Sequence, residues 1–179
     1  IEGHDFAETL RLLAERAGVV LKREDPHLQS ERNRLYEIHE IAAHLYKQTL
    51  KATPTALEYL ALRGVANATL TEFQIGFAPK RWDYLLRTLR EKGFRLDEIA
   101  KAGLIVEAPE RRTWYDRFRS RIMFPAADAS GRVVGFSGRI FWEEVPKKDG
   151  SVSAKYINTP QTPIYDKSRV LYGFDKARD

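Results

Sequence analysis

Two segments of the sequence decide the fold: Tyr115-Asp-Arg-Phe-Arg-Ser-Arg-Ile-Met-Phe-Pro125 and Gly131-Arg-Val-Val-Gly-Phe-Ser-Gly-Arg139. In the first segment, Arg117, Arg119 and Arg121 occupy every second position. Because successive side chains of a β-strand point to opposite faces, a strand here would place the three guanidinium groups on one side. The sequence therefore predicts a strand with a row of arginines along one face.

The second segment predicts a strand that returns alongside the first. Pro125 ends the apolar run of the first strand, and the residues from Asp128 to Gly131 have the composition of a tight turn. The expected product is a β-hairpin whose arginine row ends in Arg139. Such a row is often only a solvated charged face, so the rest of the sequence must decide between that interpretation and a binding role.

Composition indicates a globular protein with an uneven distribution of charge. The chain has 179 residues, of which 43% are hydrophobic and 31% charged, and it contains no cysteine, so disulfides and thiolate zinc sites within it are excluded. No apolar run approaches the roughly 18 residues of a membrane span, and no signal peptide is recognisable, so we expect cytoplasmic residence without membrane contact. Residues 111–179 hold 14 Lys and Arg against 8 Asp and Glu, whereas residues 1–110 hold 16 against 17. The positive charge thus lies near the hairpin, as a phosphate-rich partner would require.

The N-terminal part predicts helices. Residues 5–18 carry apolar side chains at helical spacing, and Gly18 ends the segment. Residues 19–34 are polar and contain Pro26, which favours a linker. A long amphipathic helix is predicted over roughly residues 31–51, and its apolar face consists of Leu35, Ile38, Ala42, Leu45 and Tyr46.

The two histidines of this helix, His39 and His44, do not have the spacing of a zinc site. Histidines four residues apart share a helix face, whereas a separation of five turns them by roughly 140° relative to each other. We therefore expect both histidines at the surface or at the edge of the core.

Further helices are predicted over residues 54–62, 68–74, 82–92 and 96–102, with short strands at residues 75–79 and 104–106. Thr53 and Pro54 have the residue types of a helix cap and a first helical position. Arg63, at the end of the first of these helices, has two interpretations: a cation that interacts with the helix dipole, or a phosphate ligand. Trp82 is expected on a buried helix face.

Beyond the hairpin, the residue types alternate between loop and short ordered segments. Residues 143–154 are rich in charge, glycine and serine and predict a flexible loop. Residues 155–160 predict a short ordered element, residues 167–169 a basic turn, and residues 170–173 a strand. The expected fold class is α+β, with a helical N-terminal part followed by a mixed subdomain that contains the β-hairpin.

No catalytic constellation is visible in the sequence. Gly131, Gly135 and Gly138 lack the spacing of a dinucleotide-binding fingerprint, and no glycine-rich loop ends in Lys-Ser or Lys-Thr. A nucleotidyl transferase needs clustered carboxylates that hold two divalent ions, and no such cluster can be located. The sequence offers instead arginine, lysine and aromatic side chains, which bind phosphates and stack on bases. This combination is typical of proteins that bind single-stranded nucleic acid or nucleoside triphosphates.

Several ordered motifs resemble bacterial DnaG-type primases. They are the two hairpin segments, Lys155-Tyr-Ile-Asn-Thr-Pro160 and Leu171-Tyr-Gly173. Upstream, the resemblance continues through Tyr59-Leu-Ala-Leu-Arg-Gly64 and Ile75-Gly-Phe-Ala-Pro-Lys-Arg-Trp82. It implies that residues 1–18 are the closing helix of a zinc-binding domain, residues 19–34 a linker, and residues 35–179 the N-terminal subdomain of the RNA polymerase core.

The resemblance also implies a function. Primases of this family are DNA-directed RNA polymerases, hence nucleotidyltransferases, that make short RNA primers on single-stranded DNA during replication. Template, nucleoside triphosphates and a replicative helicase are the implied partners. Mg²⁺ or Mn²⁺ and Zn²⁺ would be bound outside this segment, by Toprim carboxylates and zinc ligands beyond its ends, so the segment alone is expected to bind no metal and to be inactive.

The residues that the resemblance assigns to template and nucleotide phosphates are Arg63, Arg117, Arg119, Arg121, Arg139, Lys155, Tyr156, Asn158 and Lys167. One or more of the three hairpin arginines are alternatively structural supports. On the residues alone, two other classes stay open: a non-enzymatic module that binds single-stranded nucleic acid, and a generic basic domain whose charges only keep it in solution.

Overall fold

The computed structural model describes residues 9, 13–14, 16–18, 25–108, 110, 112–141 and 154–177. The chain divides into two compact units, Ile1–Glu31 and Arg32–Asp179. In the first unit, Thr9, Leu13, Ala14 and Arg16 are helical, and Gly18 has a φ of 64°. The other residues of the predicted helix over 5–18 lie outside the described residues.

Helix α2 (Pro26–Lys51) begins five residues earlier than predicted. Asp25 precedes it, and its carboxylate accepts a hydrogen bond of 2.8 Å from the backbone amide of His27. Pro26 takes the first helical position, where a missing N–H costs nothing. Residues 26–34 of the predicted linker are therefore helical. The predicted buried face is confirmed for Leu35, Ile38, Ala42 and Tyr46, while Leu45 is half-buried.

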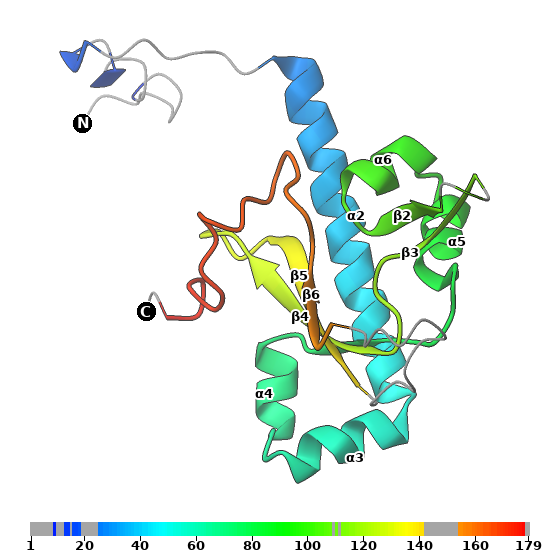
Figure 1. Ribbon diagram of the computed structural model, residues 1–179. Coiled ribbons are helices and arrows are strands. Elements are labelled where there is room, and N and C mark those ends of the chain that lie inside the picture. Colours follow the sequence, from blue (N-terminus) through cyan, green and yellow to red (C-terminus); the bar gives the residue numbers. More distant parts are fainter. Residues whose placement is uncertain are drawn as a thin grey trace. The chain divides into compact units, whose positions relative to one another are not determined.

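A four-stranded antiparallel sheet lies beside α2 in the second unit (Figure 1). Its spatial order is β1 (Gly76–Ala78), β4 (Arg121–Ala127), β5 (Val133–Ile140) and β6 (Tyr156–Asn158). The predicted hairpin is confirmed as β4 and β5. β4 continues past Pro125 to Ala127. β1 pairs only with residues 121–123 of β4. Among the described strands, none therefore pairs with β4 at Pro125 on that side, and such an edge tolerates proline.

A second, two-stranded antiparallel sheet consists of β2 (Ile105–Ala108) and β3 (Thr113–Asp116). The prediction of one strand carrying all three arginines is wrong, since β3 ends at Asp116 and β4 begins at Arg121. Between them Ser120 has a φ of 51°, a left-handed conformation outside the strand region. The three arginines consequently leave the backbone in different surroundings and form no row.

Four shorter helices match the predicted ones to within two residues at each end: α3 (Pro54–Leu62), α4 (Asn67–Glu72), α5 (Tyr84–Glu91) and α6 (Leu96–Lys101). Thr53 does not cap α3, because its hydroxyl donates to the Thr49 carbonyl at the end of α2 (2.7 Å). Trp82 precedes α5 and is 64% exposed, so its predicted burial is wrong. Residues 170–173 form no strand.

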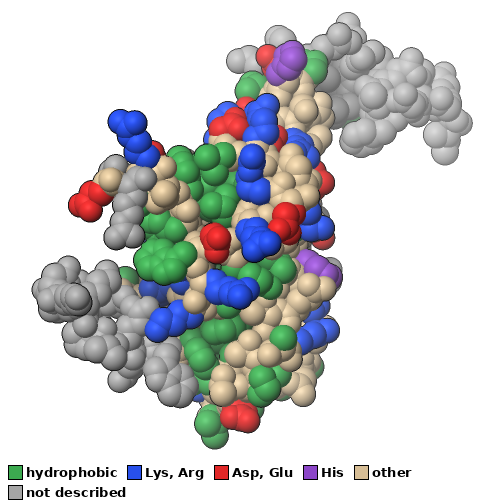
Figure 2. Space-filling model, turned by 90° about the vertical axis from the view of Figure 1, so that its right-hand side faces the viewer, with side chains coloured by type: hydrophobic (Ala, Val, Ile, Leu, Met, Phe, Trp, Pro, Cys, Tyr) green, Lys and Arg blue, Asp and Glu red, His purple; other side chains and the backbone are tan. Residues whose placement is uncertain are grey.

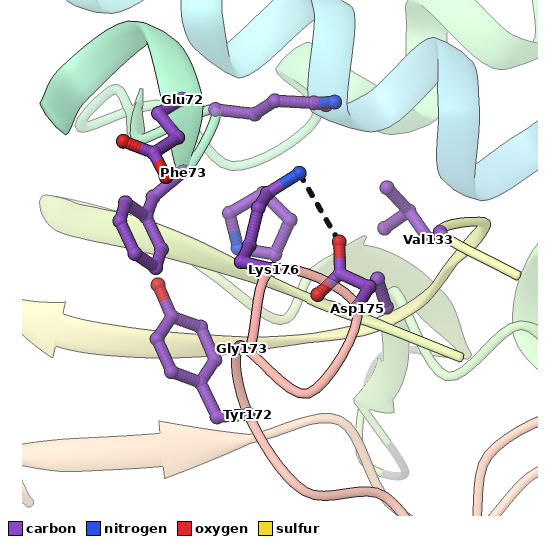
Figure 3. Close-up of a pocket in the computed structure, with 11 residues that line it drawn as sticks. Glu72, Phe73, Val133, Tyr172, Gly173, Asp175 and Lys176 are labelled. Carbon is purple, nitrogen blue, oxygen red and sulfur yellow. Dashed lines mark ion pairs between the residues drawn. The ribbon is translucent and has the colours of Figure 1, made fainter. Parts of the chain in front are cut away.

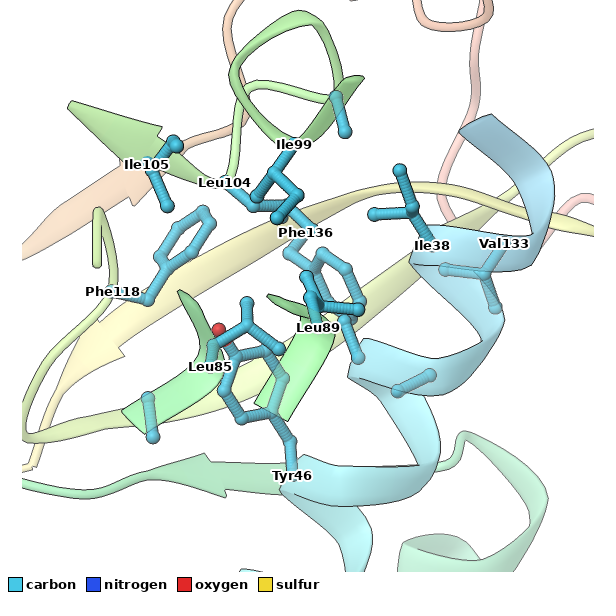
Figure 4. Packing of buried hydrophobic residues seen from close by; sticks show 14 of the residues in the cluster. Ile38, Tyr46, Leu85, Leu89, Ile99, Leu104, Ile105, Phe118, Val133 and Phe136 are labelled. Carbon is cyan, nitrogen blue, oxygen red and sulfur yellow. The ribbon is translucent and has the colours of Figure 1, made fainter. Parts of the chain in front are cut away.

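The main core lies between α2, the four-stranded sheet and the segment from α5 to β2 (Figure 4). Phe136 of β5 packs against α2, with its ring centroid 5.5 Å from that of Tyr46. Met123 belongs to this core, whereas its neighbour Ile122 belongs to a second cluster with α3 and β1. Adjacent strand residues face opposite sides, so α2 covers one sheet face and α3 covers the β1–β4 end of the other.

The described helices include none that is both long and apolar enough to cross a lipid bilayer.

Candidate nucleic-acid interface

Polar side chains of β5 and β6 lie on the sheet face that α2 does not cover. Arg139 is opposite Ile122 of β4 and Tyr156 of β6, and Ser137 is opposite Asn158. Directly opposed residues of antiparallel strands share a face. These side chains therefore lie on the side of Ile122, away from the core that contains Phe136.

Arg139 joins three separate elements on this face. Its guanidinium donates a hydrogen bond to the Tyr59 hydroxyl of α3, and its Cζ lies 5.5 Å from the Tyr59 ring centroid and 6.0 Å from that of Tyr156. Arg63, four residues after Tyr59, places its Cζ 4.7 Å from the same Tyr59 centroid. Arg63, Tyr59, Arg139 and Tyr156 together form what we term the arginine–tyrosine cluster. It unites three of the predicted site residues.

The arginine–tyrosine cluster combines a fixed centre with an accessible, positively charged periphery. Tyr59 packs edge-on against Phe141 (5.3 Å between centroids). Arg63 is exposed, and Tyr156 is 52% exposed. Within the described residues, neither Arg63 nor Arg139 is paired with a carboxylate. Two guanidinium groups around one ring, with no neutralising acid from the described part of the chain, suit an anionic ligand such as phosphate.

Arg121 supports the start of β6 instead of facing solvent. Its side chain is buried, and its guanidinium donates to the carbonyls of Gly138 (3.0 Å), Ala154 (2.9 Å) and Lys155 (3.3 Å). These hydrogen bonds hold the backbone just before Tyr156. The side chain of Lys155 is exposed. The geometry favours the structural interpretation of Arg121.

Arg117 is also bound to the backbone. Its Nε donates to the carbonyl of Gly103 (2.7 Å), and its own amide donates to that of Leu104 (2.9 Å). Burial lowers the pKa of the Arg117 guanidinium from its usual value. Arg117 therefore ties the bend after β3 to the start of β2.

Arg119 belongs to a second group, which contains an exposed aromatic ring. Its Cζ lies 4.2 Å from the ring centroid of Trp82 and 4.8 Å from that of Tyr115, and the two rings pack edge-to-face at 5.4 Å. We term Trp82, Tyr115 and Arg119 the Trp82 cluster. Figure 2 shows the side drawn at the right of Figure 1, where basic, acidic and hydrophobic side chains are interspersed. At the Trp82 cluster, the exposed indole ring and the guanidinium against it would suit stacking of a base.

In the described part of the chain, no hydrogen bond, ion pair or ring contact joins Lys167 or Asn158 to either cluster. Lys167 is exposed in a turn that Asp166 stabilises, since the Asp166 carboxylate accepts hydrogen bonds from the Ser168 amide (2.9 Å) and hydroxyl (2.6 Å). Asn158 shares the face of Arg139 but lies opposite Ser137. The structure thus links Arg63, Arg139 and Tyr156 by direct contact, and leaves the other predicted residues outside that contact group.

A pocket lies between the end of α4, the β4–β5 hairpin and the C-terminal segment (Figure 3). The rings of Phe73 and Tyr172 face each other there at 6.1 Å with an interplanar angle of 21°. Lys176 is paired with Asp175 (3.1 Å). None of the nine predicted site residues lines this pocket, so it is separate from the arginine–tyrosine cluster.

The described residues contain no group of three or more His, Asp or Glu side chains that could hold a metal ion. His39 is fully buried, which corrects its predicted place at the surface or core edge. Its Nδ1 bonds the Leu35 carbonyl (2.8 Å), its ring stacks on Phe136, and burial lowers its pKa to about 4. His44 is exposed and contacts Gln48.

The sequence pattern predicts neither Tyr59 nor Trp82 as a site residue. Tyr59 precedes Arg63 by four positions, a spacing that places two side chains on one helix face. That spacing was the available signal for Tyr59. Trp82 fitted the apolar face of a helix, and only the later start of α5 exposes it.

Comparison with known proteins identifies the family. The family model of the DNA primase catalytic core, N-terminal domain, matches residues 45–178. A DNA primase of Deinococcus radiodurans is 39% identical over 178 residues, which cover 99% of this chain and 29% of that protein. A DNA primase of Streptomyces coelicolor is 42% identical over 181 residues, covering 97% of this chain and 27% of that protein. The chain thus spans less than a third of the length of these curated relatives.

Solved structures agree with this assignment. The RNA polymerase domain of Mycobacterium tuberculosis primase DnaG, in complex with a double-stranded DNA oligomer with a 6-nucleotide overhang, matches with a TM-score of 0.71 and 37% identity over 80% of this chain and 43% of that one. A DnaG primase catalytic domain bound to single-stranded DNA matches with a TM-score of 0.71 and 36% identity over 84% of this chain and 44% of that one. The chain therefore belongs to the family of the N-terminal domain of the bacterial DNA primase catalytic core.

Proposed function

We propose that this chain is part of a DNA primase, an enzyme that makes short RNA primers on single-stranded DNA, and that its uncovered sheet face binds template and nucleotide phosphates. The arginine–tyrosine cluster carries the proposal. It places two guanidinium groups, neither of them paired with a carboxylate of the described residues, beside an accessible tyrosine. Guanidinium groups bind phosphate oxygens in a bidentate manner, and an exposed aromatic ring stacks on a base.

The Trp82 cluster is the second proposed contact with the template. Trp82 is 64% exposed, and Arg119 lies against its ring. A base stacked on Trp82 would bring its own phosphate near Arg119. This assignment gives Arg119 a binding role and leaves Arg117 and Arg121 as supports. Lys155, Asn158 and Lys167 remain proposed phosphate or nucleotide contacts on the basis of the family resemblance.

We assign the metal-dependent part of the reaction to other regions of the protein. Among the described residues no acidic cluster offers the ligands that two divalent ions require, and the related primases are much longer than this chain. Mg²⁺ or Mn²⁺, Zn²⁺ and the helicase would bind there. The chain alone is accordingly expected to bind single-stranded DNA without synthesising primers.

The first test is a titration of the purified chain with a fluorescently labelled single-stranded oligonucleotide at several salt concentrations. For single strands, each phosphate contact makes the slope of log affinity against log salt more negative by about 0.7. We expect a clear negative slope and no preference for duplex of equal length. An affinity that does not change with salt would contradict the proposed phosphate contacts.

A second measurement addresses catalysis. The chain is mixed with template, nucleoside triphosphates and Mg²⁺, and dinucleotide formation is followed. No product is expected from the chain alone. Primer synthesis by the isolated chain would show that the catalytic groups lie within it.

A further inference from the structure

Asp116, the last residue of β3, caps helix α5 from outside the helix. Its side chain is 2% exposed, and its carboxylate accepts hydrogen bonds from the amides of Leu85 (2.7 Å) and Leu86 (2.9 Å). These two residues are the second and third of α5, whose amides have no partner within a helix. The residue just before a helix normally binds them. Asp83 occupies that place and makes no such bond, so Asp116 takes over its role.

The backbone of Asp116 is bonded to the Trp82 cluster. Its amide donates to the Trp82 carbonyl (2.6 Å), and its carbonyl accepts a hydrogen bond from the Arg119 guanidinium. Tyr115, the third member of the cluster, is its neighbour in the chain. Asp116 therefore connects all three members of the Trp82 cluster to the first turn of α5.

Building on the proposed template contact of the Trp82 cluster, we propose that Asp116 is a positioning residue for single-stranded DNA binding. By capping α5 and bonding Trp82 and Arg119, it holds the indole ring and the guanidinium in one arrangement before DNA arrives. A preformed surface binds more tightly because less side-chain and backbone freedom is lost on association. Asp116 itself is buried and acts through Trp82 and Arg119, without touching the nucleic acid.

Three other groups act on the Asp116 carboxylate. Asp83 just before α5 disfavours its ionised form, and Arg119 favours it. The pKa of the Tyr46 hydroxyl of α2 is raised by burial and, to a smaller extent, by the charge of Asp116. Burial is the largest influence and raises the pKa of Asp116 to about 6. Protonation replaces an acceptor that faces an amide by a hydroxyl, so acid weakens the cap hydrogen bonds while it relieves the cost of burying the charge.

The test compares Asp116→Asn with the control Asp83→Asn. Asp116→Asn places an NH₂ group where one carboxylate oxygen accepted a hydrogen bond from a backbone amide. Asp83→Asn removes a nearby negative charge, but the Asp83 side chain accepts no hydrogen bond from an α5 amide. Trp82 is observed by ¹⁹F NMR after labelling with 5-fluorotryptophan, its signal being identified from Trp82→Phe. Affinity for a single-stranded oligonucleotide is measured by fluorescence anisotropy. A purely structural role would lower the melting temperature without changing either readout in the folded protein.

Asp116→Asn is expected to move the Trp82 signal and to weaken single-strand binding about fivefold, the effect of one hydrogen bond. Asp83→Asn, which removes a negative charge but no cap, is expected not to weaken binding and to move the Trp82 signal less than Asp116→Asn does. An unchanged Trp82 signal or an unchanged affinity in Asp116→Asn overturns the positioning role, as does an equal effect of Asp83→Asn.

Trp82→Ala separates this inference from the proposed function. If it leaves the affinity unchanged, the Trp82 cluster is not a template contact and the proposed function fails there. If Trp82→Ala weakens binding and Asp116→Asn does not, only the role of Asp116 is refuted. Should Asp116→Asn fail to fold, the Trp82 signal of the unchanged chain is followed from about pH 7.5 to about pH 5. A shift with a midpoint near the pKa of Asp116 supports the inference, and a signal independent of pH overturns it.

Discussion

Replacement of Arg139 by Ala is the most direct test of the arginine–tyrosine cluster. The variant loses a hydrogen bond to Tyr59 and two ring contacts, at 5.5 Å and 6.0 Å. One hydrogen bond contributes about 1 kcal/mol to the free energy of unfolding, and an exposed cation–π contact about 0.5–1 kcal/mol. The variant should therefore stay folded, destabilised by at most about 2–3 kcal/mol.

Its effect on binding should depend on salt. If Arg139 neutralises one phosphate, the negative slope of log affinity against log salt becomes shallower by about 0.7 in the variant. The ratio of the original affinity to the variant's should then shrink about 2.5-fold between about 50 mM and about 200 mM salt. Fluorescence anisotropy with a single-stranded oligonucleotide measures this slope, and urea unfolding measures the stability.

Arg132→Gln provides the matched control for Arg139→Ala. Arg132 also lies over a tyrosine, with its Cζ 4.0 Å from the Tyr36 ring centroid, but Asp128 neutralises it at 2.9 Å. It should lose stability without a change in salt dependence. An unchanged slope in Arg139→Ala, or an equal reduction in Arg132→Gln, would refute the assignment of Arg139 to a phosphate.

Three further predictions follow from the same contacts. Tyr59→Phe removes the hydroxyl that accepts a hydrogen bond from Arg139 but keeps the ring. Its affinity for single-stranded DNA should fall less than that of Arg139→Ala, and urea unfolding should show a stability loss of about 1 kcal/mol. A larger loss of affinity than in Arg139→Ala would contradict this. Arg121→Lys retains the charge, but the lysine ammonium cannot reach all three carbonyls that Arg121 bonds. Calorimetry should show a loss of about 2–3 kcal/mol in the free energy of unfolding. A loss near zero would mean that Arg121 has no structural role. Burial raises the pKa of Asp116 from 3.8 to about 6 and lowers the pKa of His39 from 6.5 to about 4. As the pH falls through this range, the folded state protonates Asp116 before the unfolded state does, so the stability contributed by Asp116 rises. The unfolded state protonates His39 before the folded state does, so the stability contributed by His39 falls. Asp116→Asn removes the opposing effect, so its melting temperature should drop more than that of the unchanged chain between about pH 7 and about pH 4.5, and an equal drop would refute this balance.

The sequence determined the local elements because their signals are local. Helical periodicity gave α3 to α6 to within two residues at each end. The turn residues Asp128 to Gly131 gave the β4–β5 hairpin, where the Asp128 carboxylate accepts from the amides of Ser130 and Arg132. The ordered motifs were sufficient to indicate the primase family, which the comparisons confirm.

Tertiary structure alone decided what the arginines do. Alternation along the chain predicted one row for Arg117, Arg119 and Arg121, but the pairing of Asp116 with Ile105 in a separate sheet and the left-handed Ser120 break the strand between them. One guanidinium then bonds a loop carbonyl, one stacks on Trp82, and one is buried against three carbonyls. No local pattern carries this information, because it depends on which strand each segment pairs with.

The binding surface depends on the same long-range contacts. Arg139 bonds a tyrosine 80 residues away in the sequence, and the β4–β5–β6 register decides that its side chain faces away from α2. His39 is buried for a similar reason, since Phe136 of β5 stacks on its ring. Side-chain chemistry and periodicity are written in the sequence, whereas strand register and the packing of α2 and α3 on opposite sheet faces determine which of those side chains meet.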